Sequence, residues 1–413
     1  MRIAYLTGTY PRATDTFIQR EIFALRDRDV AVFTFGVRAP NPEHLVGVEQ
    51  REEHKRTFYI LPPTPGKLLG AHLGLLLRSP GRYLKGLALA WQTSQAGVRG
   101  FLYQLFYFLE AGILAHEIRR QKIQHLHNHL GDSSCSVAML AAELGGFSFS
   151  FTLHGPYIFY KPYFWRLDAK ILKAKFVSCI SYFCRSQAMY FVPLSAWDKL
   201  KIVHCGVDPE LFKPVVHEGE GYRLLYVGRL SAAKGLPILL ESLVSLRSQY
   251  PKLQLTVVGD GEDRAELEAL SHQLELDEVV NYVGYKSQTE VREVMQQTDV
   301  FVLPSFAEGV PVALMEAMAA QVPVVTTRIA GVAELVDDGV SGYVIPPGNK
   351  TALREAIAAL LSSPERRNQF GQAGRAKVER EFNIKHEANR LYEIMHAALT
   401  PKEETDETIT LIH

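Results

Sequence analysis

The sequence has few cysteines, and their spacing matches no metal-binding or redox motif. The four are Cys135, Cys179, Cys184 and Cys205, and no CxxC pair occurs among them. Zinc sites and disulfide frameworks both use characteristic short cysteine spacings, so neither is predicted here. We expect four reduced thiols in a cytosolic protein.

Long hydrophobic runs are also missing. The stretch FLYQLFYFLEAGILA is interrupted by Gln104 and Glu110 and falls short of the eighteen apolar residues of a membrane-spanning helix. The opening MRIAYLTGTYP has one basic residue and a short apolar run, which favours a strand over a signal peptide. We expect a cytoplasmic protein that could still lie peripherally on the inner face of the membrane.

Low-complexity tracts and repeats are absent, and the net charge is zero. With 47% hydrophobic and 22% charged residues, the 413-residue chain is predicted to be folded and to form two domains. Its halves differ in charge, because residues 1–205 hold 25 Lys and Arg against 14 Asp and Glu, while residues 206–413 hold 20 against 31. This asymmetry indicates an anionic partner of the first half, such as a membrane surface or an acidic substrate; unevenly solvated surfaces explain it equally well. No nucleic-acid partner is predicted.

Strand-like and helix-like segments alternate along both halves, which predicts parallel sheets. The first series includes RIAYLT, VAVFTF and FSFSFTLHG, and a second begins with LLYVGRL after the polar segment VVHEGEGYR. We predict two Rossmann-like domains, residues 1–205 and 206–383, that face a central cleft. A helix of about residues 384–400 could pack back on the first domain, and the charged tail PKEETDE is expected to be mobile.

Residues that follow strands are the candidate site residues, because ligands of open parallel sheets bind beyond the carboxyl ends of the strands. YVGRLSAAKG places Arg229 and Lys234 between a strand and a helix, where two cations and backbone N–H groups favour a diphosphate. In EGVPVALMEA, Glu308 and Glu316 could both accept hydrogen bonds from hydroxyls of one ligand. A solvated basic loop, and a helix cap followed by a surface glutamate, are the alternatives.

The first half offers histidines and a glycine loop. His154 ends the strand FTLHG, and HLHNH places His125, His127 and His129 at alternate positions, hence on one face of a strand. Such alternation could mimic a metal site, but no Asp or Cys partner occurs at a useful spacing, so we predict polar residues lining the cleft and no metal. Gly8 is expected to let a ligand approach the backbone closely.

These motifs together resemble those of the retaining, nucleotide-sugar-dependent glycosyltransferases of family 4, which have the two-domain GT-B fold. The similar segments cover residues 224–349 almost continuously: VGRLSAAKG, VVGDGEDRAELE, YVGY, DVFVLPSFAEGVPVALMEAMAAQVPVVTT and GVAELVDDGVSGYVIPPGN. The first half is similar more loosely, through HNHLGD, TLHG and HCGVDPELFKP. Its TDTFIQREIFAL resembles members that build bacterial exopolysaccharides and lipid-linked oligosaccharides.

The resemblance implies a role for each candidate residue. Arg229 and Lys234 would bind the donor diphosphate, Glu308 the transferred sugar and Glu316 the ribose, while His154 would face the donor sugar. The implied catalytic residues are His154, Arg229, Lys234 and Glu308. The implied donor-binding residues are Gly8, Gly284, Tyr285, Gly309, Val310 and Glu316. The acceptor side of the cleft would hold His127, Asn128 and His129.

The activity implied is that of a retaining hexosyltransferase that acts on a saccharide or lipid-linked acceptor in surface polysaccharide biosynthesis. Neither a cofactor nor a metal is expected, because two cationic side chains can neutralise the leaving diphosphate. A nucleotide-sugar epimerase of the same fold and a non-catalytic sugar-nucleotide-binding protein remain alternatives. An NAD-dependent oxidoreductase is disfavoured, since neither half has a GxGxxG turn.

One residue departs from the family pattern. Gln321 stands where many members have glycine, just after a helix, at a position that usually takes left-handed backbone. We expect a small local loss of stability there and no effect on the two glutamates.

Overall fold

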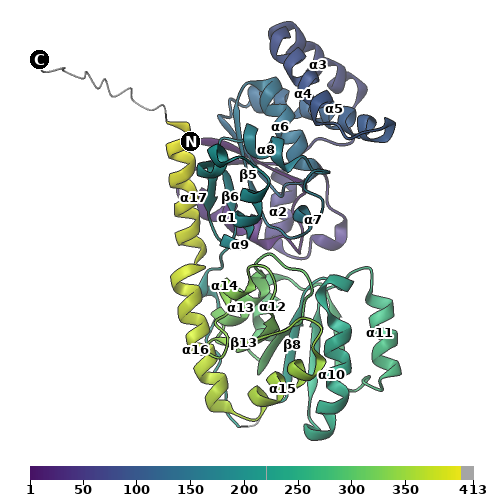
Figure 1. The fold of residues 1–413 in the computed structure, drawn as a ribbon, viewed down its shortest axis with the longest axis vertical. Coiled ribbons are helices and arrows are strands. Elements are labelled where there is room, and N and C mark those ends of the chain that lie inside the picture. The colour runs from purple at the N-terminus through teal and green to yellow at the C-terminus, as the bar shows by residue number, and fades with distance from the viewer. Residues whose placement is uncertain (220, 401–413) are drawn as a thin grey trace, which may run out of the picture.

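A computed structural model describes residues 1–219 and 221–400. Within them, two parallel sheets, each flanked by helices, lie one above the other in Figure 1. This is the α/β architecture of two Rossmann-like units that the alternating pattern predicted, and the prediction is confirmed. The tail PKEETDE, predicted to be mobile, lies outside the described residues.

The first sheet has seven parallel strands in the order β3-β2-β1-β4-β5-β6-β7. The order reverses between β1 and β4, and such a switch point opens a crevice at the carboxyl ends of the strands. The strands are β1 Arg2–Thr9, β2 Ala31–Arg38, β3 Phe58–Tyr59, β4 His125–His129, β5 Ser148–Leu153, β6 Val177–Cys179 and β7 Leu200–Ile202. The helices are α1 Thr16–Arg26, α2 Val48–Arg56, α3 Pro65–Arg78, α4 Pro80–Thr93, α5 Val98–Arg120, α6 Ser133–Gly145, α7 Tyr157–Tyr160, α8 Leu167–Lys173 and α9 Tyr182–Tyr190.

The second sheet has six parallel strands in the order β10-β9-β8-β11-β12-β13, with its switch point between β8 and β11. The strands are β8 Arg223–Val227, β9 Gln254–Val258, β10 Val280–Gly284, β11 Val300–Leu303, β12 Val324–Thr327 and β13 Gly342–Ile345. The helices are α10 Leu236–Gln249, α11 Arg264–Gln273, α12 Gln288–Met295, α13 Val312–Ala319, α14 Val332–Leu335, α15 Lys350–Leu361 and α16 Pro364–Glu381. All four residues of β11 are buried, as expected of a strand covered by helices on both faces.

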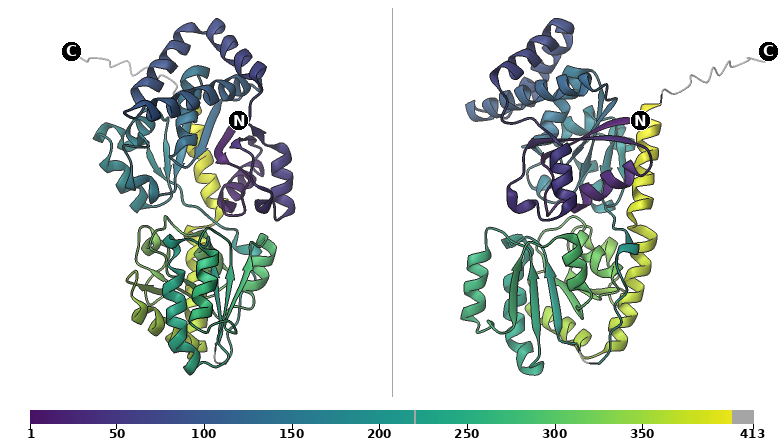
Figure 2. Two further views of the ribbon diagram at one scale, coloured as in Figure 1. Left: turned by 90° about the vertical axis from the view of Figure 1, so that its right-hand side faces the viewer. Right: turned by 180° about the vertical axis from the view of Figure 1, so that it is seen from behind.

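The last described helix returns to the first unit. Helix α16 runs along the second unit, and α17 (Ile384–Leu399) continues past the first, so the two form one column beside both sheets (Figure 2). Leu391 and Met395 of α17 are buried in a cluster with Ile18 and Ile22 of α1. The last described helix is therefore part of the core of the first unit.

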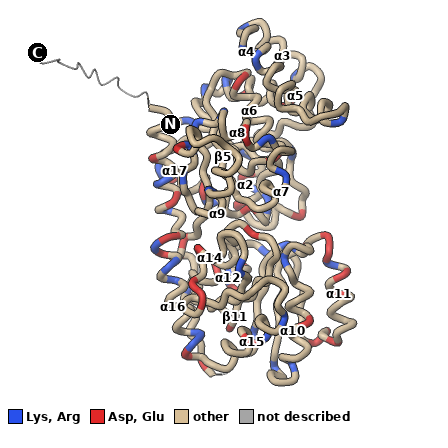
Figure 3. Tube along the Cα trace, viewed as in Figure 1, with Lys and Arg blue, Asp and Glu red and all other residues tan. Residues whose placement is uncertain are grey.

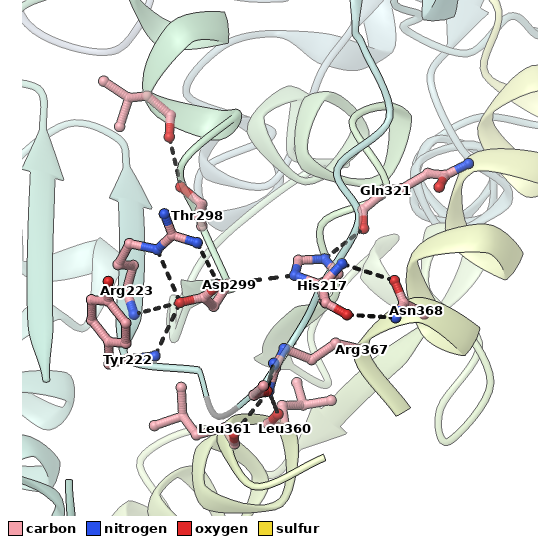
Figure 4. Close-up of polar contacts among 12 residues, drawn as sticks. His217, Tyr222, Arg223, Thr298, Asp299, Gln321, Leu360, Leu361, Arg367 and Asn368 are labelled. Carbon is pink, nitrogen blue, oxygen red and sulfur yellow. Dashed lines mark hydrogen bonds and ion pairs between the residues drawn. The ribbon is translucent and has the colours of Figure 1, made fainter. Parts of the chain in front are cut away.

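Polar contacts fix the connection between the two units, as Figure 4 shows. Asp299 accepts hydrogen bonds from the backbone N–H groups of Tyr222 and Arg223 and from the Arg223 guanidinium. Burial raises the pKa of Asp299, but His217 and these donors outweigh that effect and hold it well below its usual range. Asn368 bonds both the N–H and the carbonyl of His217. The described part of the connection is thus bound to the second unit.

None of the helices in the described ranges carries a stretch long and apolar enough to cross a membrane.

Gln321 has the left-handed backbone expected from its position after α13, with φ of 60°. A side chain in this region costs roughly 1 kcal/mol relative to glycine, because the β-carbon crowds the carbonyl. We expect Gln321→Gly to raise the free energy of unfolding by up to about 1 kcal/mol in urea titrations. The control Gln321→Ala keeps the β-carbon and should show no gain. Equal stability of the two variants would contradict a strained backbone.

Candidate functional site

A cavity of about 830 Å³ lies between the two units, where the strands of both sheets end. A space of this size suits a small-molecule ligand. Its lining includes eight of the predicted site residues: His154, Arg229, Lys234, Tyr285, Glu308, Gly309, Val310 and Glu316. Gly284 lies just behind the wall, where its carbonyl accepts a hydrogen bond from the N–H of Gly259.

Lys234 and Glu308 form an ion pair in the cavity wall. The Lys234 ammonium donates to Oε1 of Glu308 over 2.6 Å, and the Ser305 hydroxyl donates to the same oxygen over 2.7 Å. Gly235 allows this approach, because its φ is 67° and a β-carbon there would overlap the carbonyl oxygen of Pro304. The loop after β8 is therefore pressed against the end of β11, so that cation and carboxylate meet.

Arg229 has a partner that the sequence did not reveal. Its guanidinium donates to Glu262, at 3.0 Å, in the turn after β9. The two side chains are 59% and 54% exposed, and exposed ion pairs contribute little to stability. Arg229 can therefore exchange this carboxylate for an anionic ligand at small cost.

The Glu316 carboxylate of the second unit is bound by a side chain of the first unit. Arg20 of α1 donates to the Glu316 carboxylate and, over 2.8 Å, to the side-chain oxygen of Gln288 on α12. A second contact also joins the two units. The Glu334 carboxylate accepts hydrogen bonds from two backbone N–H groups at the start of α9, at 2.8 Å each. No sequence signal links Arg20 to Glu316, because 296 positions separate them.

His154 belongs to a buried chain of hydrogen bonds. Its Nε2 lies 2.9 Å from Nδ1 of His129, and its Nδ1 lies 3.6 Å from Sγ of Cys205. Nε2 of His129 contacts Glu21 at 3.0 Å, and the Tyr5 hydroxyl donates to the same carboxylate oxygen over 2.7 Å. Because the carboxylate only accepts, His129 donates from Nε2 and its Nδ1 accepts from Nε2–H of His154. Nδ1 of His154 then accepts from the Cys205 thiol.

His127, Asn128 and His129 do not line the cleft, so that prediction is wrong. All three are fully buried, because β4 is an interior strand covered on both faces. The ring nitrogens of His127 contact the hydroxyls of Ser150 and Thr152 on the neighbouring strand β5. Alternation placed the histidines on one face correctly but does not indicate whether that face is covered.

Gly8 is also displaced from its predicted place. It belongs to β1, and it is not among the described residues that line the cavity. The nearby cavity wall is formed by the residues that follow it, Arg12 to Phe17.

Glu21 is the acidic partner that the sequence analysis did not find for the histidines. Ligand atoms of Glu21, His127 and His129 lie within 4.8 Å of one another, close enough to hold an ion by distance alone. Each of the three is hydrogen-bonded to neighbouring groups in the protein, so the cluster is satisfied without a metal.

The second unit matches a known protein family. Residues 207–377 fit the family described as glycosyl transferases group 1. The match covers less than half of the chain and makes the second unit similar to a group 1 glycosyl transferase domain. This domain contributes Arg229, Lys234, Glu308 and Glu316 to the cavity.

Two curated relatives share part of the chain. It is 34% identical over 206 residues to the amylovoran biosynthesis glycosyltransferase AmsK of Erwinia amylovora, a stretch covering 48% of this chain and 51% of AmsK. It is 35% identical over 196 residues to WcaL of Escherichia coli, provisionally named a colanic acid biosynthesis glycosyltransferase, covering 45% and 48%. The chain thus spans about half the length of these relatives. The predicted alternatives, an epimerase and a non-catalytic binding protein, receive no support from them.

Solved structures resemble this chain over nearly its whole length. Sucrose-phosphate synthase of Thermosynechococcus elongatus superposes with a TM-score of 0.74 at 19% identity. HepE of Anabaena, solved in complex with UDP and glucose, gives 0.73 at 17%. Both cover 96% of this chain and 100% of their own. At such identities the likeness concerns the fold, and it confirms the predicted GT-B fold.

Two fully buried histidines and His154 of the cavity wall make stability depend on pH. Burial lowers the pKa of His125 to about 3 and holds the pKa of His127 and His154 well below its usual value, with neighbouring histidines adding to the effect. In the unfolded chain these histidines bind protons as the pH falls below about 6.5, whereas in the folded chain they stay neutral. Their contribution to stability is therefore complete above that pH and falls below it. Each such histidine contributes up to about 1.4 kcal/mol per pH unit.

We expect His125→Gln to flatten the fall in the free energy of unfolding between pH 6.5 and pH 5, measured by urea titration at each pH. His272, whose side chain is 83% exposed, supplies the control His272→Gln, which should keep the wild-type slope. A slope unchanged by His125→Gln would show that His125 takes up protons equally in the folded and unfolded protein, and would contradict the lowered pKa.

Proposed function

We propose that the protein is a glycosyltransferase that moves a sugar from a nucleoside-diphosphate donor to a hydroxyl of a saccharide or lipid-linked acceptor in surface polysaccharide biosynthesis. The observation that carries this proposal is the convergence of Arg229, Lys234, Glu308 and Glu316 on one cavity between the two units. The group 1 glycosyl transferase match and the naming of AmsK for amylovoran biosynthesis support it.

The cationic loop supports binding of the donor diphosphate. Lys234 and Arg229 lie on the loop between β8 and α10, and α13 starts beside Val310, so cations and a helix N-terminus face the same space. The diphosphate would bind there and gain negative charge as the bond to the sugar breaks. Two side-chain cations and aligned backbone dipoles stabilise that charge, so we propose catalysis without a metal or cofactor.

The glutamates support binding of the sugar and ribose. Glu308 lies beside Lys234, next to the expected position of the diphosphate, and Glu316 lies on α13, the helix that follows Glu308, in the same cavity wall. Carboxylates accept hydrogen bonds from hydroxyl groups, so Glu308 would hold the transferred sugar and Glu316 the ribose. Because Arg20 already occupies Glu316, the ribose would share or replace that contact.

We propose transfer with retention, as in family 4. The acceptor hydroxyl would attack the anomeric carbon from the face that the diphosphate leaves. The bond from the anomeric carbon to the acceptor oxygen would form as the bond to the diphosphate breaks, and the departing phosphate would take the hydroxyl proton. His154 is kept neutral by burial and by His129, so at neutral pH it would contribute a polar wall and not a positive charge.

Loss of either member of the ion pair tests the proposal. We expect Lys234→Ala and Glu308→Ala to lower the transfer rate by about a hundredfold or more, since removing one electrostatic contact to a transition state costs this much. The rate would be followed as release of nucleoside diphosphate with the donor that the wild-type protein turns over. Lys252→Ala, an exposed lysine away from the cavity, is the matched control. Normal turnover by Lys234→Ala or Glu308→Ala would contradict the assignment.

Substitution of Gly309 tests whether the two units must lie this close together at the cleft. A β-carbon at residue 309 would overlap the carbonyl oxygen of His154 on the opposite unit. Gly309→Ala should force the units apart by about 1 Å, and a misplacement of that size can lower a rate by about a hundredfold. Gly66→Ala meets no atom within 4 Å and is the control. Wild-type turnover by Gly309→Ala would show that the close approach is not needed.

A further inference from the structure

Helices α4 and α5 expose an unusual amount of apolar surface. On α4, Leu84, Leu87 and Trp91 follow helical spacing along one face and are 62%, 39% and 70% exposed. On the first turns of α5, Phe101, Leu102 and Leu105 are also exposed. These six residues are called the α4–α5 surface below.

The two stripes form one surface. The rings of Trp91 and Phe101 meet edge to face, with centroids 5.6 Å apart. The opposite face of α4 is used for packing, since Leu89 and Ala90 are buried and Gly86 lies against Leu144 of α6. Single exposed leucines are ordinary on soluble proteins, but a contiguous apolar surface marks an interaction site.

Positive charge surrounds this surface. Residues 54–109 contain seven Lys and Arg and no Asp or Glu. Figure 3 shows α3 and α4 marked by basic residues alone. Across the described ranges, no ion pair engages Arg78, Arg82, Lys85 or Arg99. An apolar surface that contains a tryptophan, together with these four cations, which form no ion pair within the described residues, is complementary to an anionic membrane surface.

An aromatic loop extends the surface toward the cavity. Gln95 donates to the carbonyl of Phe164 over 2.7 Å, and Arg166 donates to the carbonyl of Gln92 over 2.6 Å. Tyr163 and Phe164 are 70% and 47% exposed. This loop follows His154 of the cavity wall by about ten residues, so the surface and the cavity are joined by one short segment of the first unit.

We propose that the α4–α5 surface docks the protein on an anionic lipid bilayer. The helices lie at the end of the first unit, away from the second (Figures 1 and 2), so docking there leaves both sides of the cavity free. The charge asymmetry of the sequence indicated a membrane surface or an acidic substrate as partner of residues 1–205, and the exposed helices favour a membrane surface met by α4 and α5. The role of docking in bringing the protein to a lipid-linked acceptor rests on the proposed function. The docking itself does not depend on that function.

Vesicle flotation with the full chain tests the proposal without donor or acceptor, so its failure is distinct from a failure of sugar transfer. The vesicles contain phosphatidylcholine alone or phosphatidylcholine with phosphatidylglycerol, at low salt and at about 0.15 M, where screening acts beyond about 8 Å. The apolar variant is Leu84→Ser/Trp91→Ser/Phe101→Ser. Its matched control is Leu211→Ser/Val216→Ser/Val340→Ser, at three exposed positions 55%, 73% and 54% accessible on the second half of the chain.

We expect binding to phosphatidylglycerol vesicles that weakens with salt, and a loss of about tenfold or more in the apolar variant, because binding scales with buried apolar area. The control should bind as the wild type does. A second variant, Lys85→Gln/Arg99→Gln, leaves the apolar residues in place and should also bind less, so the test holds even if the apolar variant fails to fold.

Three results would overturn the proposal. The first is no flotation with phosphatidylglycerol vesicles at low salt. The second is equal flotation of wild type and both α4–α5 variants. The third is that the wild type is a dimer in sedimentation equilibrium and the apolar variant a monomer, while both bind vesicles equally. That result would assign the surface to a second copy of the chain.

Discussion

The close contact between the two units at the mouth of both sheets determines the shape of the site. Gly309 lies so near the carbonyl oxygen of His154 that a β-carbon would overlap it, and Arg20 and Glu334 bridge the units on either side. Side chains from two separate cores can therefore face one cavity at fixed distances. Helix α17 strengthens the arrangement, because it belongs to the core of the first unit although it follows α16 of the second.

The charged pairs of this cavity differ in how buried and how tightly bound they are. Lys234 and Glu308 are largely buried and share a short contact, whereas Arg229 and Glu262 are more than half exposed and weakly paired. Glu316 is held by a cation from the opposite unit. An anionic ligand with hydroxyl groups can therefore replace some of these ion pairs with its own contacts, as the proposed sugar nucleotide would have to do. Behind the cavity, Glu21 and His129 set the orientation of His154, a positioning role that lies outside the cavity wall.

Much of the fold could be predicted from the sequence, and the reasons for the failures are specific. The alternating segments predicted both parallel sheets. The motifs after β8 and β11 also predicted that Arg229, Lys234 and Glu308 would lie at strand ends, and all three line the cavity there, while their roles stay predictions. His127, Asn128 and His129 were misplaced, since strand alternation gives a shared face and not its burial. Arg20 and Glu21 were missed because their partners are 296 and 108 positions away. The exposed face of α4 could not be told from a buried one, as helical spacing is the same for both.

Donor binding by the wild-type protein tests the central claim most directly, namely that the cavity between the units holds a nucleoside diphosphate sugar. Thermal unfolding would be measured with UDP-, GDP- and ADP-sugars and with the corresponding nucleosides, which lack the diphosphate. Binding to the folded state raises the melting temperature. The account predicts that at least one sugar nucleotide raises it while its nucleoside leaves it nearly unchanged. No shift with any donor, or an equal shift with the nucleoside, would contradict it.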